Sequence, residues 1–311
     1  MKKGDKVKNN QNDLYVKTEE EYLANYNSKS FNDSKFSVTC DILIFTVQNK
    51  ESEENSNDLD DKRLKIALIQ RNDYPDLNKW ALPGGFVKKG KETTHQAALR
   101  KLDEEISLKN IYLEQLYTWD DLSRDPREHI LSVSYMTLVN NEETIIKAGS
   151  DAKDARWFEV NKNFKQLNKI LTDNGYIKEE IYEIILTNND IKIKGKIKEI
   201  VTVEGRVRKK RVEIIEDENI AFDHIKIINY ALERLKNKVD YTDIMFNLLP
   251  QYFTIAEAHT TYKLLTGKEY TNQNFRKKFK SMWVETDRKS KKYSPKPARL
   301  YKLNINWDED R

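Results

Sequence analysis

The chain contains a single cysteine in 311 residues, Cys40, which excludes a disulfide framework within the chain. Because Cys40 lies inside an apolar, strand-like run, we expect a buried thiol there. No apolar run approaches the length of a transmembrane helix, and the N-terminal residues lack the apolar segment of a signal peptide. We therefore expect a cytoplasmic protein, long enough for about two domains.

Basic residues are distributed unevenly along the chain. The net charge is +4, yet residues 274–302 carry eleven lysines and arginines against two acidic residues, a local charge of +9. The rest of the chain must then sum to −5. This asymmetry predicts a polyanion as the partner of the C-terminal region.

Residues 93–106 (TTHQAALRKLDEEI) predict a helix, which follows the glycine-containing segment LPGGFV. Thr93 or Thr94 suits its N-cap. The apolar residues of its buried stripe recur at a spacing of four, as in an amphipathic helix, and are Ala98, Leu102 and Ile106.

Charged residues gather on another face of this helix. Lys101, Glu104 and Glu105 are three and four positions apart and therefore share that face. Gly84 and Gly85 would let the preceding backbone approach a ligand closely. Carboxylates beside such a loop suit Mg²⁺, which prefers oxygen ligands and is often shared with substrate phosphates. The same helix residues also fit a surface helix in which Lys101 pairs with Glu105.

Loop and helix together resemble the Nudix box, a pattern of Gly, five residues, Glu, seven residues and Arg-Glu-apolar-x-Glu-Glu-x-Gly-apolar. Gly85 begins the match, and Glu92 comes one residue late. The residues at their expected positions are Arg100, Leu102, Glu104, Glu105 and Leu108. Two positions depart, because Lys101 stands where the family has Glu and Ser107 replaces the Gly.

The resemblance implies that Glu92, Glu104 and Glu105 are the candidate ligands of a divalent metal, Mg²⁺ or Mn²⁺. Lys101 places an ammonium group beside them and removes a carboxylate that could serve as a base. We therefore expect weakened metal binding and weak or absent hydrolysis, and we assign no catalytic residue.

The order of the elements predicts the α/β class, with a mixed α/β/α sandwich. Strands are expected on both sides of the Nudix-box helix, at 37–47, 64–71, 112–119, 130–139 and 155–160. A short helix at 18–31 precedes them, and the polar segment 48–63 is predicted to be a loop of a hairpin.

Residues 161–221 predict an insertion with a helix within 164–186 and a β-hairpin that turns near Glu204 and Gly205. The alternating Lys and Arg of the hairpin would form the exposed face of a sheet, with a second nucleic-acid surface as the alternative. Residues 222–241 predict an amphipathic linker helix, in which we expect His224 to be a hydrogen-bonded structural histidine.

The C-terminal residues 242–311 predict a winged helix-turn-helix domain. Its first helix has Thr254 as N-cap, Glu257 as the second half of a capping box, and Gly267 as its end. Its second helix begins after Thr271, turns two phenylalanines to the core and leaves its basic residues outside. A basic hairpin follows. The sequence thus divides into 1–33, a Nudix domain at 34–160, the insertion, the linker helix and this domain.

Over nearly its whole length the chain resembles the Nudix-related transcriptional regulators of NAD and sugar metabolism. The blocks that carry the resemblance include LIQRNDYPDLNKWALPGGFV, SRDPREHILSVSY, AFDHIKIINYALERL and FTIAEAHTTYKLLTGKEYTNQNFRKKF. The family implies a degenerate Nudix domain that senses ADP-ribose or a related ligand, and a winged helix that binds operator DNA as a homodimer. The ligand-pocket candidates are Arg71, Gly84, Gly85, Arg100, Asp125 and Arg127. The candidates for DNA contact are Asn272, Asn274, Arg276, Lys277, Lys280, Lys296 and Arg299.

Two hypotheses follow. The first is a ligand-responsive transcription regulator whose pocket binds a pyrophosphate without cleaving it. The alternative is a metal-dependent Nudix hydrolase of ADP-ribose or another nucleoside diphosphate derivative, supported by the retained Glu92, Glu104 and Glu105. The charge reversal at Lys101 and the winged helix favour the regulator.

Overall fold

The computed structural model describes residues 36–50, 58–106, 111–140, 146, 152–189, 191–293 and 296–307, without the side chains of residues 60, 105 and 106. The chain divides into two compact units, residues 1–36 and 37–311. The fold below is that of the second unit, and the helix predicted at 18–31 lies outside the described residues.

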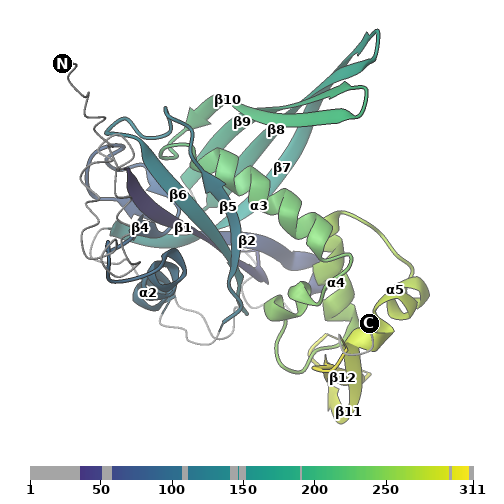
Figure 1. Cartoon of the computed structure of the whole chain (residues 1–311). Coiled ribbons are helices and arrows are strands. Elements are labelled where there is room, and N and C mark those ends of the chain that lie inside the picture. Colours follow the sequence, from purple (N-terminus) through teal and green to yellow (C-terminus); the bar gives the residue numbers. More distant parts are fainter. Residues whose placement is uncertain are drawn as a thin grey trace, which may run out of the picture. The chain divides into compact units, whose positions relative to one another are not determined.

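A large sheet dominates this unit (Figure 1). Its strands are β1 (Ser37–Asn49), β2 (Lys62–Arg71), β3 (Trp80–Ala81), β4 (Gly84–Phe86), β5 (Glu114–Trp119), β6 (Ile130–Leu138), β7 (Ala152–Thr172), β8 (Gly175–Asn188), β9 (Ile191–Glu204) and β10 (Val207–Glu218). The order across the sheet is β10-β9-β8-β7-β2-β1-β6-β5, with β3 paired to β2 and β4 to β1. The pair of β1 and β6 is parallel, and the other pairs in the described part are antiparallel.

Strand β1 shows how the two faces of the sheet are covered. Successive side chains of a strand point to opposite faces. Cys40 and Ile42 belong to one buried cluster with Ala98 of helix α2 (Thr94–Ile106), whereas Leu43 belongs to another with Ile225 of helix α3 (His224–Lys238). The two helices therefore cover opposite faces, which confirms the predicted α/β/α sandwich. Cys40 is fully buried, as expected, and burial raises the pKa of its thiol to about 12.

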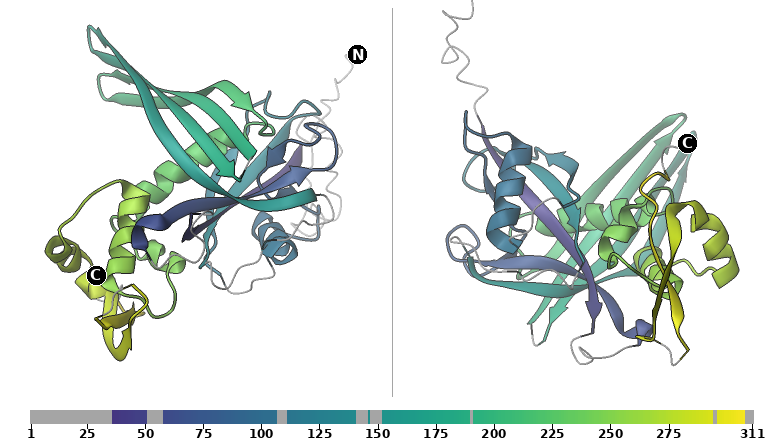
Figure 2. Two further views of the ribbon diagram at one scale, coloured as in Figure 1. Left: turned by 180° about the vertical axis from the view of Figure 1, so that it is seen from behind. Right: turned by 90° about the horizontal axis from the view of Figure 1, so that it is seen from below.

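The predicted helix within 164–186 is wrong, because these residues form the adjoining long strands β7 and β8. The two strands pair from Glu159–Thr187 to Thr172–Gly175, around a turn at 173–174. Apolar residues of β7 recur at helix-like spacing, but this turn, Asp-Asn before Gly, favours a hairpin. The second predicted hairpin, β9 and β10 around Gly205, is confirmed. The four strands extend the sheet beyond β2 (Figures 1 and 2).

The remaining elements form the winged helix. They are η6 (Ile244–Leu248), α4 (Ile255–Thr266), α5 (Asn272–Phe279), η7 (Lys280–Met282), β11 (Trp283–Ser290) and β12 (Ala298–Leu303). Thr254 and Glu257 form the predicted capping box, and Gly267 ends α4 in a left-handed conformation, φ +69°. A short 3-10 turn, η4 (Leu59–Asp61), precedes β2. In the described part, none of the helices is long and apolar enough to cross a bilayer.

Candidate ligand pocket and DNA-binding surface

Helix α2 begins where the sequence predicts. Thr93 is its N-cap, since its Oγ1 accepts a hydrogen bond from the Gln96 amide (3.2 Å) while Gln96 Oε1 accepts one from the Thr93 amide (2.8 Å). This reciprocal pair satisfies two of the amides that a helix start leaves without partners. The cap fixes the register of the helix and thereby the face on which the Nudix-box charges lie.

Lys101 is turned inward beside the glycine loop. Its side chain is only 8% exposed, and its Nζ lies 3.1 Å from Glu104 Oε2. A Cβ on Gly85 would stand 2.7 Å from Lys101 Cε, so the glycine makes room for the lysine. Burial alone would raise the pKa of Glu104, but hydrogen bonds from Lys101 and Arg100 hold it below its ordinary value. A protein ammonium group therefore neutralises the carboxylate face of the box.

Glu92 is held by Arg100. The guanidinium donates from Nε and Nη2 to the two carboxylate oxygens at 3.0 and 2.8 Å, and from Nη1 to Glu104 at 3.2 Å. These hydrogen bonds, with one from the Lys88 amide, lower the pKa of Glu92 to about 2. The side chain of Glu105, the third predicted metal ligand, lies outside the described residues.

This donor set fits a divalent cation poorly. Glu92 and Glu104 already accept from cationic side chains, and the Lys101 ammonium would lie within a few ångströms of a metal bound to Glu104. Among the described residues, no group of three or more His, Cys, Asp or Glu side chains is placed to hold a metal ion.

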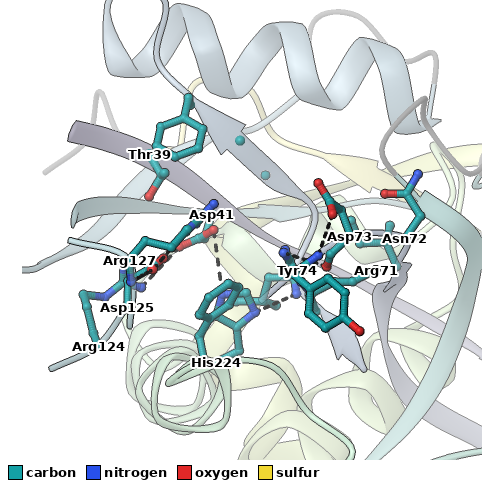
Figure 3. A pocket seen from close by; sticks show the side chains of 17 residues that line it. Thr39, Asp41, Arg71, Asn72, Asp73, Tyr74, Arg124, Asp125, Arg127 and His224 are labelled. Carbon is teal, nitrogen blue, oxygen red and sulfur yellow. Dashed lines mark hydrogen bonds and ion pairs between the residues drawn. The ribbon is translucent and has the colours of Figure 1, made fainter. Parts of the chain in front are cut away.

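A pocket of about 210 Å³ is lined in part by the glycine loop (Gly84 and Gly85), and Figure 3 shows its polar side chains. Strand β1 supplies Thr39 and Asp41, the end of β2 supplies Arg71, and the segment between β5 and β6 supplies Asp125 and Arg127. The segment before α3 closes the pocket. Gly84 must lack a side chain here, because a Cβ would lie 2.3 Å from the Cys40 carbonyl oxygen of β1.

Two arginines lie over the same aromatic ring. The guanidinium carbons of Arg71 and Arg127 are 4.8 and 5.9 Å from the centroid of Phe222. Burial and the neighbouring charge of Arg127 lower the pKa of Arg71, whereas the nearby carboxylates of Asp76, Asp125 and Asp73 act in the opposite direction, and the guanidinium stays charged. Asp125 accepts two hydrogen bonds from the Arg127 guanidinium, from Nε at 3.0 Å and Nη2 at 2.8 Å, and a third from the Arg127 backbone amide. An anion placed here would relieve the repulsion between the arginines.

Phe222 itself is held in a strained conformation. Its φ is +51°, which a bulky residue adopts at a cost of roughly 1–3 kcal/mol. The Phe222 amide donates to Asp76 Oδ2 at 2.9 Å, which fixes the strained turn. Such strain is typical of functional sites, and here it presents the aromatic ring to both arginines.

The floor of the pocket is a buried polar network. Arg124, 5% exposed in its side chain, binds both oxygens of Asp223 at 2.9 and 3.2 Å and lies 3.6 Å from Asp41. His224 accepts from the Leu82 amide at 3.0 Å through Nδ1, which leaves the proton of the neutral ring on Nε2, 3.9 Å from Asp41. Burial lowers the pKa of His224, so the ring stays neutral.

The network joins β1, the segment after β5 and the start of α3. His224 is the hydrogen-bonded histidine that the sequence predicts, and it also lines the pocket. Of the six predicted pocket residues, those that line it are Arg71, Gly84, Gly85, Asp125 and Arg127. Arg100 does not line it and pairs with Glu92 instead. Sequence reasoning missed Asp41, Arg124 and Phe222, although the last two lie within the blocks SRDPREH and AFDHIK.

The second predicted site, on the winged helix, is exposed. All seven predicted DNA contacts are at the surface, namely Asn272, Asn274, Arg276, Lys277, Lys280, Lys296 and Arg299. Phe275 and Phe279 of α5 are fully buried, which turns the basic residues of that helix outward. Arg276 of α5 and Arg299 of β12 border one hollow of about 290 Å³. Arg299 also pairs with Glu285 of β11.

Lys278 of α5 has a different role from its neighbours. Its Nζ lies 2.6 Å from Asp240 Oδ1, and the same carboxylate is bound by Lys268 and by the hydroxyl of Tyr262. The network fixes α5 against α4 and the end of α3. On the other side, His259 stacks on Phe275 and hydrogen-bonds through Nδ1 to Asn272 Oδ1 at 3.0 Å.

Both parts of the chain match known domain families. Residues 56–180 match the NUDIX domain, and residues 245–303 match the NrtR DNA-binding winged helix domain. The chain is 28% identical over 290 residues to the ADPR responsive transcriptional repressor NtrR of Acinetobacter baylyi, covering 93% of this chain and 89% of the relative.

Two solved structures extend this likeness to three dimensions. A MutT/nudix family protein from Enterococcus faecalis is 26% identical with a TM-score of 0.62, covering 93% of this chain and 94% of the other. Shewanella oneidensis NrtR complexed with a 27mer DNA is 25% identical with a TM-score of 0.58, covering 88% and 95%. The two domains occur in the same order as in the relatives, so the chain is similar to transcriptional regulators that join a Nudix domain to an NrtR-type winged helix.

Proposed function

We propose that this protein is a ligand-responsive transcription regulator. Its Nudix pocket binds ADP-ribose or a related nucleotide or sugar phosphate, and its winged helix binds operator DNA. The Acinetobacter relative is named for its response to ADPR, and the Shewanella relative was crystallised with DNA, which supports both halves of the proposal.

The chemistry of the pocket supports a pyrophosphate ligand. Arg71 and Arg127 repel one another over Phe222, and a doubly charged phosphate bridge would accept hydrogen bonds from both. Phe222 offers an aromatic face, and Thr39 and Asp41 offer oxygen atoms to ligand hydroxyls. The ligand class is thus an anion that also carries sugar hydroxyls.

The observation that carries the proposal is the position of Lys101. Its amine binds Glu104 directly behind Gly85, which lines the pocket, so a cation of the protein takes the place in which active Nudix enzymes keep a carboxylate. The pocket can then hold a pyrophosphate that it does not hydrolyse. A regulator needs this property, because its output must follow the concentration of an intact ligand.

The hydrolase alternative requires Mg²⁺ or Mn²⁺ at Glu92, Glu104 and Glu105. Metal binding there would have to displace Arg100 from Glu92 and overcome the charge of Lys101. We propose that any metal at this face is held weakly and that ligand binding does not depend on it.

A test separates binding from turnover. We expect ADP-ribose to bind the purified protein in EDTA by isothermal titration calorimetry, and to remain intact on prolonged incubation with Mg²⁺ or Mn²⁺ when AMP and ribose 5-phosphate are assayed. Multiple turnover would overturn the regulator proposal in this form. Binding to DNA upstream of its own gene, with and without ADP-ribose, then measures the response.

We propose further that the regulator binds DNA as a homodimer. Two winged helices related by a two-fold axis would each enter a major groove, about 34–36 Å apart along the duplex. Analytical ultracentrifugation of the free protein and of its DNA complex measures this stoichiometry.

A further inference from the structure

Strand β10 lies at the end of the large sheet and has one edge open. It pairs with β9 on one side, and on the other side it has no strand partner among the described residues. The strand is twelve residues long, which corresponds to roughly 40 Å of backbone. Nearly all of its residues are exposed or half-buried. An open edge of this length can pair with another strand.

The charges of β10 are separated by sign along the strand. The half before Val212 carries Arg208, Lys209, Lys210 and Arg211, and the half after it carries Glu213, Glu216, Asp217 and Glu218. Edge strands that merely avoid association carry charges that repel a second copy. A second β10 strand in parallel orientation would be repelled, because the two basic halves would lie side by side. A second β10 strand in antiparallel orientation would be attracted, because each basic half would lie beside an acidic half.

From this we infer that β10 is a self-association surface, which binds β10 of a second copy of this chain in antiparallel register about a two-fold axis at Val212. Arg211 of each copy then lies opposite Glu213 of the other. Beyond the irregularity between Ile214 and Glu216, the basic half of one copy continues along the acidic half of its partner. Such a contact is isologous, as a closed dimer requires.

Most of the charged side chains of β10 form only weak, exposed ion pairs within their own chain, so they can pair with a second copy. Arg211 pairs with Glu213 of the same strand at 3.2 Å, with 71% of the arginine side chain exposed. Glu216 lies 3.7 Å from Lys196 and is 63% exposed. Exposed pairs of this kind contribute little, so exchange for partners on a second copy costs little. Lys210 is the exception, since it is bound to Glu199 and Glu233 beneath the strand.

A hollow beside the acidic half supports the same orientation. It has a volume of about 560 Å³ and is bordered by Val212, Glu213, Ile214 and Asp217 of β10 and by Lys226 of α3. Five carboxylates and three basic side chains line it, so it is net acidic. In the antiparallel pair the basic half of the partner strand runs along this hollow.

Strand β7 provides the contrast. Its residues beyond Val160 are not paired with β2 and expose Phe164, Leu167 and Leu171. However, residues 160–172 contain three lysines and no acidic residue, so two copies of this edge repel one another. Charge therefore selects β10 for self-association.

The proposal deepens the homodimer proposed above, whereas ligand binding rests on other residues. Its test uses two variants of the full chain measured by sedimentation equilibrium. One variant changes Arg208, Lys209 and Arg211 to Glu, and the other changes Glu213, Glu216 and Asp217 to Lys. We expect each alone to raise the dimer dissociation constant by at least about 100-fold, because like charges then face each other.

Mixing the two variants should restore the dimer as a heterodimer, since opposite charges again align. A control that changes Lys165 and Lys169 of β7 to Glu should leave self-association unchanged. A monomeric wild-type chain at 100 µM, dimers that persist in both variants, or loss of the dimer in the β7 control would each overturn the proposal.

Two further measurements keep the outcomes distinct. Circular dichroism and ADP-ribose titration of each variant report folding and the pocket, so a failed pocket would count against the proposed function and not against β10. Hydrogen exchange of the wild-type chain needs no variant. We expect the β10 amides to exchange at least about tenfold more slowly at high than at low protein concentration, and equal exchange in a proven dimer would place its interface elsewhere.

Discussion

Helices α2 and α5 both carry adjacent basic residues, and they use them in opposite ways. In α2, Arg100 and Lys101 turn toward Glu92 and Glu104 of their own domain, and Lys101 is buried. In α5, the neighbouring basic residues project to solvent, because the apolar positions of the helix are fully buried beneath them. The same residue types thus neutralise the charge of a carboxylate cluster at α2 and form an exposed cationic surface on α5.

The difference lies in what surrounds each helix. Beside α2, Gly85 leaves space for the Lys101 side chain, and the carboxylate of Glu104 lies within ion-pair distance of it. At α5, Asp240 binds Lys278, whose neighbours Arg276 and Lys277 are exposed. Charge alone therefore does not indicate a nucleic-acid surface. A nucleic-acid surface requires basic side chains that are both exposed and clustered on one face, as they are on α5.

The largest effect is expected at α5. Replacing Arg276 and Lys277 by Ala should weaken operator binding about 100-fold and reduce the slope of log affinity against log salt by about two, since two phosphate contacts are lost. Fluorescence anisotropy over a range of salt concentrations measures both. The control Lys236→Ala changes an exposed lysine of α3 and should leave affinity unchanged. An unchanged salt slope in the double variant would remove α5 from the interface.

Lys101→Glu tests whether the buried lysine of α2 weakens metal binding at the carboxylate cluster. Restoring a carboxylate beside Glu104 should tighten Mn²⁺ binding about 30-fold, because an ammonium is replaced by an oxygen ligand. Isothermal titration calorimetry with Mn²⁺ measures this. Lys101→Met removes the charge without adding a ligand, so it should give a smaller gain. Equal affinities for the three proteins would mean that Lys101 does not control metal binding at this face.

Local signals explain which parts of the site could be predicted. The cap at Thr93 or Thr94, the capping box at Thr254 and the end at Gly267 are each determined within a few residues. The structure selects Thr93 for the first and confirms the other two. The buried network that joins Arg124 to Asp223 was missed, because these residues are 99 positions apart. Only the folded sheet brings them together.

The predicted helix within the insertion was also wrong, and the cause is a tertiary contact. The apolar residues of 164–171 repeat with the period of a helix, but β8 supplies hydrogen bonds to this segment along its whole length. A strand partner overrides a weak local periodicity. The opposite hairpin, β9 and β10, was predicted correctly because its alternation of charged and apolar residues has a period of two.

Glu199 of β9 also forms buried ion pairs with lysines, and their contribution to stability can be measured as a function of pH. Burial acts to raise its pKa, but hydrogen bonding to Lys210 and the charge of Lys162 lower it to about 2. The unfolded chain then takes up a proton below about pH 4.5 while the folded chain does not, so stability is present above that pH and is lost as pH falls toward 2.

We expect Glu199→Gln to lower the free energy of unfolding by about 1.5 kcal/mol near pH 7 and to flatten its decline in acid. Urea titrations at several pH values measure this. Glu204→Gln removes an exposed carboxylate at the end of the same strand, β9, and serves as the control. A wild-type chain and a Glu199 variant with parallel pH profiles would contradict the assigned pKa.

The smallest effect is expected where the two helices become alike. Asp240 pairs with Lys278 of α5, as Glu104 pairs with Lys101 of α2. Asp240→Asn should weaken the contact that holds α5 and lower operator affinity about threefold. The salt slope should not change, because we expect Lys278, which pairs with Asp240, to make no phosphate contact. Lys278→Met should reproduce the loss, since it breaks the same pair from the other side. If Asp240→Asn instead tightens operator binding and steepens the salt slope, the released Lys278 contacts a DNA phosphate. The Asp240 carboxylate, rather than the position of Lys278 on α5, would then be what keeps this lysine from the DNA in the wild-type chain.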